Sequence, residues 1–260
     1  MQQMRRKLTR ICPTTVSVLL QGEVGVGKSL ISRFIHSHSP GITGPYVSVN
    51  CAALSDPSLD KDRFADSEDG VGVVFARVQQ DIATSSVGTL FLDQVSELTP
   101  QLQQQLSSPL ADCDEFKCMD QGSTRGKLRI ISASTRDLRQ EVKLGRFRRE
   151  LFYRLAEVTI NAPPLRNRTE DLPLISEYLR LRYCAQLGIA GTPFSADLLA
   201  RMLDYQWPGN IRELENFVCR YVLLGSDHCR FPEPGADTES SPEVDWGGPV
   251  VGKLKQYWRN

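Results

Sequence analysis

GEVGVGKS, residues 22–29, is the stretch that decides the fold of this 260-residue chain. It fits the pattern G-x-x-x-x-G-K-[ST], follows a short apolar run at residues 16–20 and precedes residues 30–36, which we expect to be helical. Glycines let backbone amides wrap around phosphates, and the helix N-terminus adds a favourable dipole. A glycine-rich turn without a ligand is the alternative, but the motif stands where a phosphate loop must stand. We therefore expect phosphate binding by Gly22, Glu23, Val24, Gly25, Val26, Gly27, Lys28 and Ser29, with Lys28 on the outer phosphates and Ser29 on Mg2+.

A second element of the predicted site is TLFLDQ, residues 89–94, an apolar run that ends in a carboxylate. Proteins with a phosphate loop place the acid that holds Mg2+ and its water at this point. An aspartate that only caps a strand is the alternative, and without the upstream loop it would be preferred. Downstream of residues 22–29, Asp93 is the expected metal-binding acid.

Short apolar runs alternate with helical patterns as far as residue 160, which predicts a parallel sheet covered by helices on both faces. After residue 165 the apolar residues recur at helical spacing, with Thr169 and Ser195 as expected helix caps. We expect an α/β nucleotide-binding subdomain at 1–165, a helical lid at 166–230 and a loosely ordered tail at 231–260, with a final turn near 254–258. The expected strands are residues 16–20, 46–49, 89–92, 128–132 and 157–160.

The composition argues against several classes of protein. Lys+Arg and Asp+Glu both number 31, so no overall basic field draws the chain onto nucleic acid. No apolar stretch approaches the roughly 20 residues that span a bilayer, and the first ten residues lead into no signal-peptide core. We therefore expect a cytoplasmic protein without a membrane partner. The seven scattered cysteines favour reduced thiols over a zinc site.

Several longer motifs carry a family resemblance that spans about residues 10 to 226. The chain resembles the AAA+ domain of sigma-54-dependent bacterial transcription activators. This resemblance implies an AAA+ P-loop NTPase fold, with a parallel five-stranded sheet and a helical lid, and ATP and Mg2+ as cofactors. The motifs are residues 22–29, PYVSVNCAAL at 45–54, GTLFLD at 88–93, GRFRRELFYRL at 145–155, PPLR at 163–166 and WPGNIRELEN at 207–216.

The resemblance also implies roles for single residues. Asn50 is the switch residue beside Asp93, while Ser134 and Thr135 take the first sensor position, where the family commonly has Thr-Asn. Arg212 is the lid sensor that closes on the nucleotide. Arg148 and Arg154 match arginine fingers, which reach a neighbouring subunit's nucleotide and so imply a ring, usually a hexamer. RNA polymerase and its sigma factor are the family's partners.

The first departure from the family pattern concerns hydrolysis. The family follows the aspartate of the second element with a glutamate, whereas this chain has Gln94. An amide orients water but cannot take its proton, and positioned acid-base groups typically contribute about 10²–10⁴-fold in rate. We therefore expect ordinary ATP binding with slow or absent turnover, so Asp93, Gln94, Asn50, Arg148 and Arg154 form an altered catalytic set.

Two further departures concern partners. Where the family's GAFTGA loop contacts sigma-54, this chain has DGVGVV at residues 69–74, so Val71 replaces the aromatic anchor and Gly72 the threonine. We therefore expect direct remodelling of sigma-54 to be impaired. Residues 227–260 show no helix-turn-helix pattern, so no DNA-binding domain is visible in this chain, and no receiver domain is visible before Thr15. Either this is an excised domain, or the natural protein acts without its own DNA-binding module.

Three functions remain open from the sequence. The first is an ATPase motor that remodels sigma-54 RNA polymerase, and the second is a nucleotide-gated assembly that regulates transcription with little hydrolysis, which Gln94 favours. The third is a sigma-54-independent regulator that responds to cyclic di-GMP, because Arg33 matches a position used by some relatives, although Phe34 does not match. An unrelated small-molecule kinase lacks an acceptor site, since His36, His38 and His228 form no relay.

Overall fold

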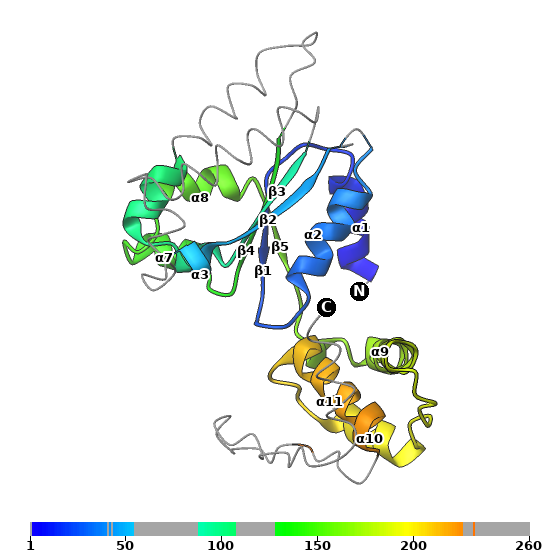
Figure 1. Cartoon of the computed structure of the whole chain (residues 1–260). Coiled ribbons are helices and arrows are strands. Elements are labelled where there is room, and N and C mark those ends of the chain that lie inside the picture. The colour runs from blue at the N-terminus through cyan, green and yellow to red at the C-terminus, as the bar shows by residue number, and fades with distance from the viewer. Residues whose placement is uncertain are drawn as a thin grey trace, which may run out of the picture.

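Five parallel strands form the sheet of the computed structural model, which describes residues 2–40, 42, 44–54, 88–107, 128–225 and 231. They lie in the order β2-β3-β4-β1-β5, and every neighbouring pair is parallel (Figure 1). The expected α/β fold is confirmed, and each strand lies within two residues of its expected ends. The strands are β1 (Val18–Gln21), β2 (Tyr46–Asn50), β3 (Thr89–Asp93), β4 (Arg129–Ser134) and β5 (Val158–Asn161).

Both faces of the sheet are buried, which explains why its central strands read as unbroken apolar runs. Side chains alternate between the faces along a strand, so Val18 and Leu20 join one core cluster while Leu19 joins the other. All three side chains are fully buried. Helices must therefore cover the sheet on both sides.

The first face is covered by α1 (Gln2–Ile11) and α2 (Lys28–Ser37). Leu8 of α1 and Ile35 of α2 pack with Val18, Leu20 and Ile131 of the sheet. The pattern of residues 30–36 predicted α2, but no helix was expected where α1 lies. α1 is therefore an addition to the expected fold.

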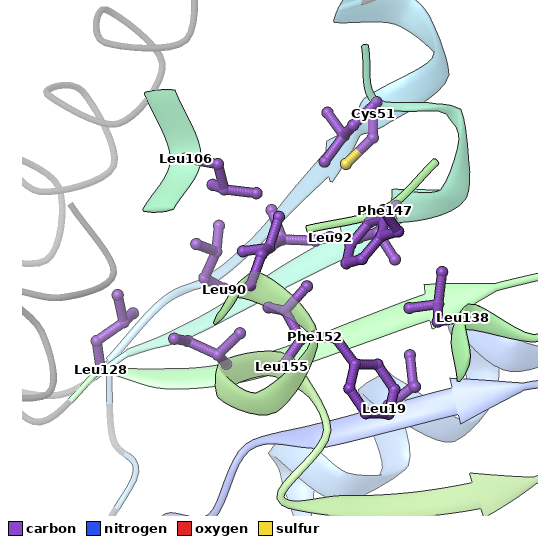
Figure 2. Close-up of a cluster of buried hydrophobic side chains, with 14 residues drawn as sticks. Leu19, Cys51, Leu90, Leu92, Leu106, Leu128, Leu138, Phe147, Phe152 and Leu155 are labelled. Atoms are coloured by element: carbon purple, nitrogen blue, oxygen red, sulfur yellow. The ribbon is translucent and has the colours of Figure 1, made fainter. Parts of the chain in front are cut away.

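The second face is covered by α3 (Cys51–Leu54), the helical residues 100–107, α7 (Leu138–Lys143) and α8 (Arg149–Leu155). Figure 2 shows this cluster, in which Leu106, Leu138, Phe152 and Leu155 gather with Leu90 and Leu92 of β3 and with Leu19 of β1. Leu90, Leu92 and Leu155 are almost entirely shielded from solvent. This packing fixes the end of β3, where Asp93 lies.

The strand order brings β1 beside β4, although the helices that follow them lie on opposite faces of the sheet. In open α/β sheets, ligands bind outside the carboxyl ends of strands at such a switch point. β1 ends at Gln21, directly before the glycine-rich loop, and Gln21 pairs in register with Ser134 at the end of β4. The topology thus brings the loop and Ser134 together.

As far as residue 225, the lid has three helices after two short 3₁₀ turns, and its core includes Leu179, Met202 and Trp207. Ser195 caps α10 as predicted, because its hydroxyl accepts a hydrogen bond from the Leu198 amide at 3.2 Å. Thr169 was expected to cap the first helix, but it begins the second 3₁₀ turn instead. None of the helices in the described ranges is long and apolar enough to cross a membrane. The lid elements are η2 (Leu165–Asn167), η3 (Thr169–Asp171), α9 (Leu172–Leu187), α10 (Ala196–Asp204) and α11 (Asn210–Leu224).

The tail expected at 231–260 lies outside the described residues except for Phe231. That ring stacks on Phe217 with centroids 4.8 Å apart and meets Trp207 edge to face at 6.0 Å. Phe231 is therefore part of the lid's aromatic core. The expected turn at 254–258 also lies outside the described residues.

Candidate nucleotide-binding site

The loop of residues 22–29 runs from β1 to α2 and turns at glycines with positive φ. Gly25 has φ +75° and Gly27 has φ +95°, in the left-handed region that side chains disfavour. A Cβ atom on Gly25 would also lie 2.2 Å from the carbonyl oxygen of Gly209 in the lid. Glycine at 25 therefore serves both the turn and the close approach of the lid.

Lys28 lies at the first position of α2 and is almost completely buried. Its Nζ donates hydrogen bonds to the carbonyl oxygens of Gly22, at 2.8 Å, and Glu23, at 2.9 Å. Burial lowers the pKa of this ammonium, while the nearby Asp93 carboxylate acts to raise it. The charge of Lys28 is thus held inside the loop and near Asp93. Ser29 follows it on α2 and is exposed.

Asp93, Gln94 and Asn50 lie together at the carboxyl ends of β2 and β3. Asn50 pairs in register with Asp93, and its side-chain oxygen accepts a hydrogen bond from the Ala52 amide at 3.1 Å. Gln94 has φ 58° and ψ 44°, a left-handed conformation that costs a non-glycine residue roughly 1–2 kcal/mol. Strain of this kind is often stored at functional sites. The left-handed conformation of Gln94 ends β3 directly after Asp93.

The expected first sensor, Ser134 and Thr135, lies where β4 ends. Ser134 is buried, and its carbonyl accepts a hydrogen bond from the Gly22 amide at 3.3 Å. Its hydroxyl donates to the Arg136 carbonyl at 2.6 Å, and the Arg136 amide donates to that hydroxyl at 3.1 Å. Ser134 thus contacts the loop through its backbone, while its side chain shapes the turn that follows β4. Thr135 is partly exposed.

Glu23 joins the loop to two segments that follow the sheet. Arg166 donates two hydrogen bonds to its carboxylate, at 2.8 and 2.5 Å, and Asn210 donates a third at 3.1 Å. The hydrogen bonds from Arg166, and then that from Asn210, lower the pKa of Glu23 to about 2. No role was expected for Arg166 or Asn210 from the sequence. Their only signal was their place in the quoted motifs, PPLR and WPGN.

Arg212, the expected lid sensor, lies on α11 close to the loop. A Cβ atom on Gly25 would lie 3.1 Å from the Cβ atom of Arg212. The side chain of Arg212 is exposed. The structure thus brings Arg212 beside the glycine-rich loop, together with Lys28.

The two expected arginine fingers, Arg148 and Arg154, lie at either end of α8. Arg148 is exposed and immediately precedes the helix, where its amide donates to the side chain of Gln103 at 2.9 Å. Arg154 is half-buried and donates to the Ser107 carbonyl at 2.7 Å. The side chain of Arg148 is thus exposed to solvent, whereas the side chain of Arg154 is hydrogen-bonded within the chain.

Two other positions raised by the sequence have local partners. The Arg33 guanidinium lies 4.9 Å from the centre of the Tyr46 ring, and the Phe34 ring stacks on His38 at 4.0 Å. Residues 69–74, which correspond to the family's sigma-contacting loop, lie outside the described residues.

Comparison with known protein families gives two matches in chain order. Residues 1–161 match the sigma-54 interaction domain, and residues 166–230 match the AAA+ ATPase lid domain.

Curated relatives are regulators of transcription that are longer than this chain. The chain is 36% identical over 224 residues to the transcriptional regulatory protein ZraR of Klebsiella oxytoca. The matched region covers 86% of this chain and 51% of that protein. It is 40% identical over 223 residues to the transcriptional regulatory protein XylR of Pseudomonas putida, covering 83% of this chain and 39% of that protein. The chain thus spans about half the length, or less, of these relatives.

A similar solved structure extends over nearly the whole chain. The crystal structure of NtrX from Brucella abortus in complex with ATP has a TM-score of 0.70 and 26% sequence identity. The match covers 99% of this chain and 58% of that chain.

Proposed function

The chain belongs to the sigma-54 interaction domain family of AAA+ proteins, and from this premise we propose that it is an ATP-binding regulator of transcription that assembles with itself when nucleotide is bound. The observation that supports this most directly is the loop of residues 22–29, with buried Lys28 at its end and Asp93 nearby. A related protein, NtrX, was crystallised with ATP. We take residues 1–165 as the nucleotide-binding subdomain and 166–230 as its lid.

In this proposal the backbone amides of the loop bind the phosphates and Lys28 neutralises the outer ones. Lys28 donates to the carbonyls of Gly22 and Glu23 inside the loop, and it would exchange these acceptors for a phosphate oxygen. Ser134 and Thr135 would sense the phosphate from the end of β4. Arg212 would close on the nucleotide from the lid side.

Mg2+ fits the side chains at this place. A serine hydroxyl and a carboxylate are oxygen ligands of the kind that Mg2+ prefers, and Ser29 and Asp93 offer them at the ends of the loop and of β3. Bound with ATP, the ion would neutralise phosphate charge. Ser29 and Asp93 are the residues that would hold it.

We propose that hydrolysis is slow because Gln94 replaces the family's glutamate. Gln94 follows Asp93 directly and has a left-handed backbone conformation. Its amide can hold a water molecule by hydrogen bonds but cannot accept the proton that attack releases. ATP would then act mainly as a bound effector.

Self-assembly would bring Arg148 and Arg154 to a neighbouring subunit's nucleotide, in a ring such as a hexamer. Arg148 is exposed and ready for such a contact, whereas Arg154 must first leave the Ser107 carbonyl. An arginine suits this role because its charge is permanent and its planar fork matches phosphate oxygens. The proposed target is RNA polymerase, contacted through its sigma factor. The proposed location of the chain is the bacterial cytoplasm.

An ATPase motor that remodels sigma-54 RNA polymerase is the second candidate, favoured by the family membership itself. Gln94 and the altered residues 69–74 favour assembly without rapid turnover. The stacking of Arg33 on Tyr46 gives that arginine a local partner, so no observation favours cyclic di-GMP.

Measurement of ATP turnover and particle size in the same samples separates these candidates. We expect the wild type to enlarge with Mg-ATP but to release phosphate slowly, and Gln94→Glu to raise turnover by about 10²-fold or more. Gln104→Glu, at an exposed position of the helix at 100–107, is the matched control and should change nothing. Fast turnover by the wild type would support the motor and reject slow hydrolysis. A slow wild type with no gain in Gln94→Glu would reject the proposal that Gln94 is the cause of the slow hydrolysis.

A further inference from the structure

Three consecutive carbonyl groups of the glycine-rich loop accept hydrogen bonds from the lid and its connecting segment. Asn210 Nδ2 donates to the Val24 carbonyl at 3.0 Å, and the Ile211 amide donates to the Gly25 carbonyl at 2.9 Å. Arg168 Nη2 donates to the Val26 carbonyl at 2.8 Å. We call these three contacts the carbonyl clamp.

The clamp determines which way the loop's amides point. A trans peptide unit is planar, so its C=O and the following N–H point in opposite directions, and no cis peptide occurs in the described residues. Carbonyls of residues 24, 25 and 26 held toward the lid therefore turn the amides of Gly25, Val26 and Gly27 away from it. Within the described ranges the amides of Gly25 and Gly27 donate to no protein acceptor, so they stay available to an anion.

The two side chains of the clamp are built into the fold rather than resting on its surface. Asn210 is fully buried, and its oxygen accepts a hydrogen bond from the Leu165 amide at 2.7 Å. Its backbone φ of 54° is one that asparagine and aspartate tolerate better than most residues. Arg168 is 7% exposed, and burial lowers the pKa of its guanidinium. Such buried polar groups are costly to leave without partners.

We propose that Asn210 and Arg168 are positioning residues for nucleotide binding, which hold the loop's carbonyls so that its amides converge on the phosphates. This inference rests on the proposed function, because it assigns the lid a part in ATP binding at the same loop. The coupling is reciprocal: a nucleotide that fixes the amides also fixes the carbonyls, and so tightens the lid on the core. Bound ATP thereby sets the lid position without contacting Asn210 or Arg168.

Asn210→Asp is the sharpest variant. Aspartate keeps the backbone conformation and the oxygen that accepts from Leu165, but it cannot donate to the Val24 carbonyl and it places a second carboxylate beside Glu23. We expect affinity for a non-hydrolysable ATP analogue to fall about 10-fold or more, the effect of losing a hydrogen bond and leaving a buried acceptor unpaired. Asn216→Asp, at an exposed position of the same helix, is the matched control and should bind as the wild type does.

Hydrogen–deuterium exchange on the nucleotide-free chain tests the clamp without ATP. The Ile211 amide should be protected in the wild type and should exchange faster in Asn210→Asp, with Asn216→Asp unchanged. Unchanged protection in Asn210→Asp overturns the clamp. If the wild type fails to bind the analogue, the proposed function fails instead, and the exchange result alone then decides the clamp.

A rescue series separates positioning from general stability. Arg168→Met removes the donor to the Val26 carbonyl, whereas Arg168→Lys keeps a cationic donor at that place. We expect Arg168→Met to weaken binding of the analogue about 10-fold and Arg168→Lys to restore a large part of it, with both variants folded by circular dichroism. Equal affinity in the two variants, or wild-type affinity in Arg168→Met, contradicts a positioning role.

Discussion

Glu23 shows how a single side chain can connect the loop to the rest of the molecule. Its carboxylate accepts from Arg166 and Asn210, which lie 143 and 187 positions further along the chain. About two fifths of the side chains of both Glu23 and Arg166 remain exposed, so water screens their attraction. The pair therefore contributes modestly to stability, but it fixes where the loop begins.

The charge of Glu23 predicts a pH effect. Its pKa is about 2 in the folded chain against an ordinary value of 4.5, so the unfolded chain binds the proton first as pH falls. The stability from this carboxylate is complete above about pH 4.5 and is lost as the pH falls toward 2. As the pH falls from about 4.5 to 2, the free energy of unfolding should decrease in both proteins. The decrease should be about 1 kcal/mol smaller in Glu23→Gln than in the wild type.

Urea unfolding at several pH values measures this difference. Glu150→Gln, at an exposed position in the first turn of α8, is the control and should follow the wild type. The same acid dependence in Glu23→Gln and the wild type would show that the ion pair does not contribute in solution.

Gly25 predicts a second residue-level effect. Gly25→Ala places a Cβ atom 2.2 Å from the Gly209 carbonyl, whereas Gly145→Ala, at a similar φ of +72°, meets nothing within 4 Å. Both variants should lose roughly 1–2 kcal/mol through the left-handed backbone. Gly25→Ala should lose a further 1–3 kcal/mol or so through the clash with the lid. Denaturant unfolding gives both values, and equal losses would mean that the lid does not lie against the loop.

At the scale of elements, α1 is held to the sheet by a buried cation. Arg129 begins β4 and is fully buried; it donates to the carbonyls of Ile11, at 3.0 Å, and Cys12, at 3.1 Å, and to the Ser39 hydroxyl at 2.5 Å. A cation at the C-terminal end of a helix is favourable, because the helix carbonyls gather partial negative charge there. Burial lowers the pKa of Arg129 but leaves it a permanent charge.

Arg129→Met should therefore release α1. We expect the variant to lose about 2–4 kcal/mol of unfolding free energy, because two buried carbonyls lose their donor, and the amides of α1 to exchange faster. Arg139→Met, at an exposed position on α7, is the control. Unchanged exchange in α1 would mean that its apolar contacts alone hold it.

The sequence predicted the strands well and some helices less well, for physical reasons. A strand buried on both faces gives a continuous apolar run, which is why 89–92 matches β3 closely. Tyr178 fits the helical spacing of the apolar residues in the first lid helix but is 64% exposed, because α9 carries apolar residues on both of its faces. Thr169 failed as a cap because two 3₁₀ turns precede the helix.

The site was predictable where it depends on strand ends, since parallel strands end at one edge. Asn50 therefore pairs with Asp93 as expected, and Ser134 meets the loop. The contacts of Asn210 and Arg168 with the loop were not predictable, because they join segments more than 140 positions apart. These hydrogen bonds to the carbonyls of the loop are seen only in the folded chain. The roles of these residues in binding remain predictions.

At the scale of the whole molecule, the lid and the core meet at the loop that would hold the phosphates. Gly25 approaches Gly209, and Glu23 bridges Arg166 and Asn210, so movement of the lid must alter the loop. A ligand that binds one lid position better than another shifts the population toward it.

Equilibrium dialysis of Mg-ATP against the wild type and Lys28→Ala tests the central claim most directly. The account predicts saturable binding of about one nucleotide per wild-type chain and a loss of at least about 10-fold in affinity in Lys28→Ala, because the ammonium no longer neutralises the phosphates. Circular dichroism should show both proteins folded. A folded wild-type chain that retains no Mg-ATP, or that binds it equally well without Lys28, would contradict the account.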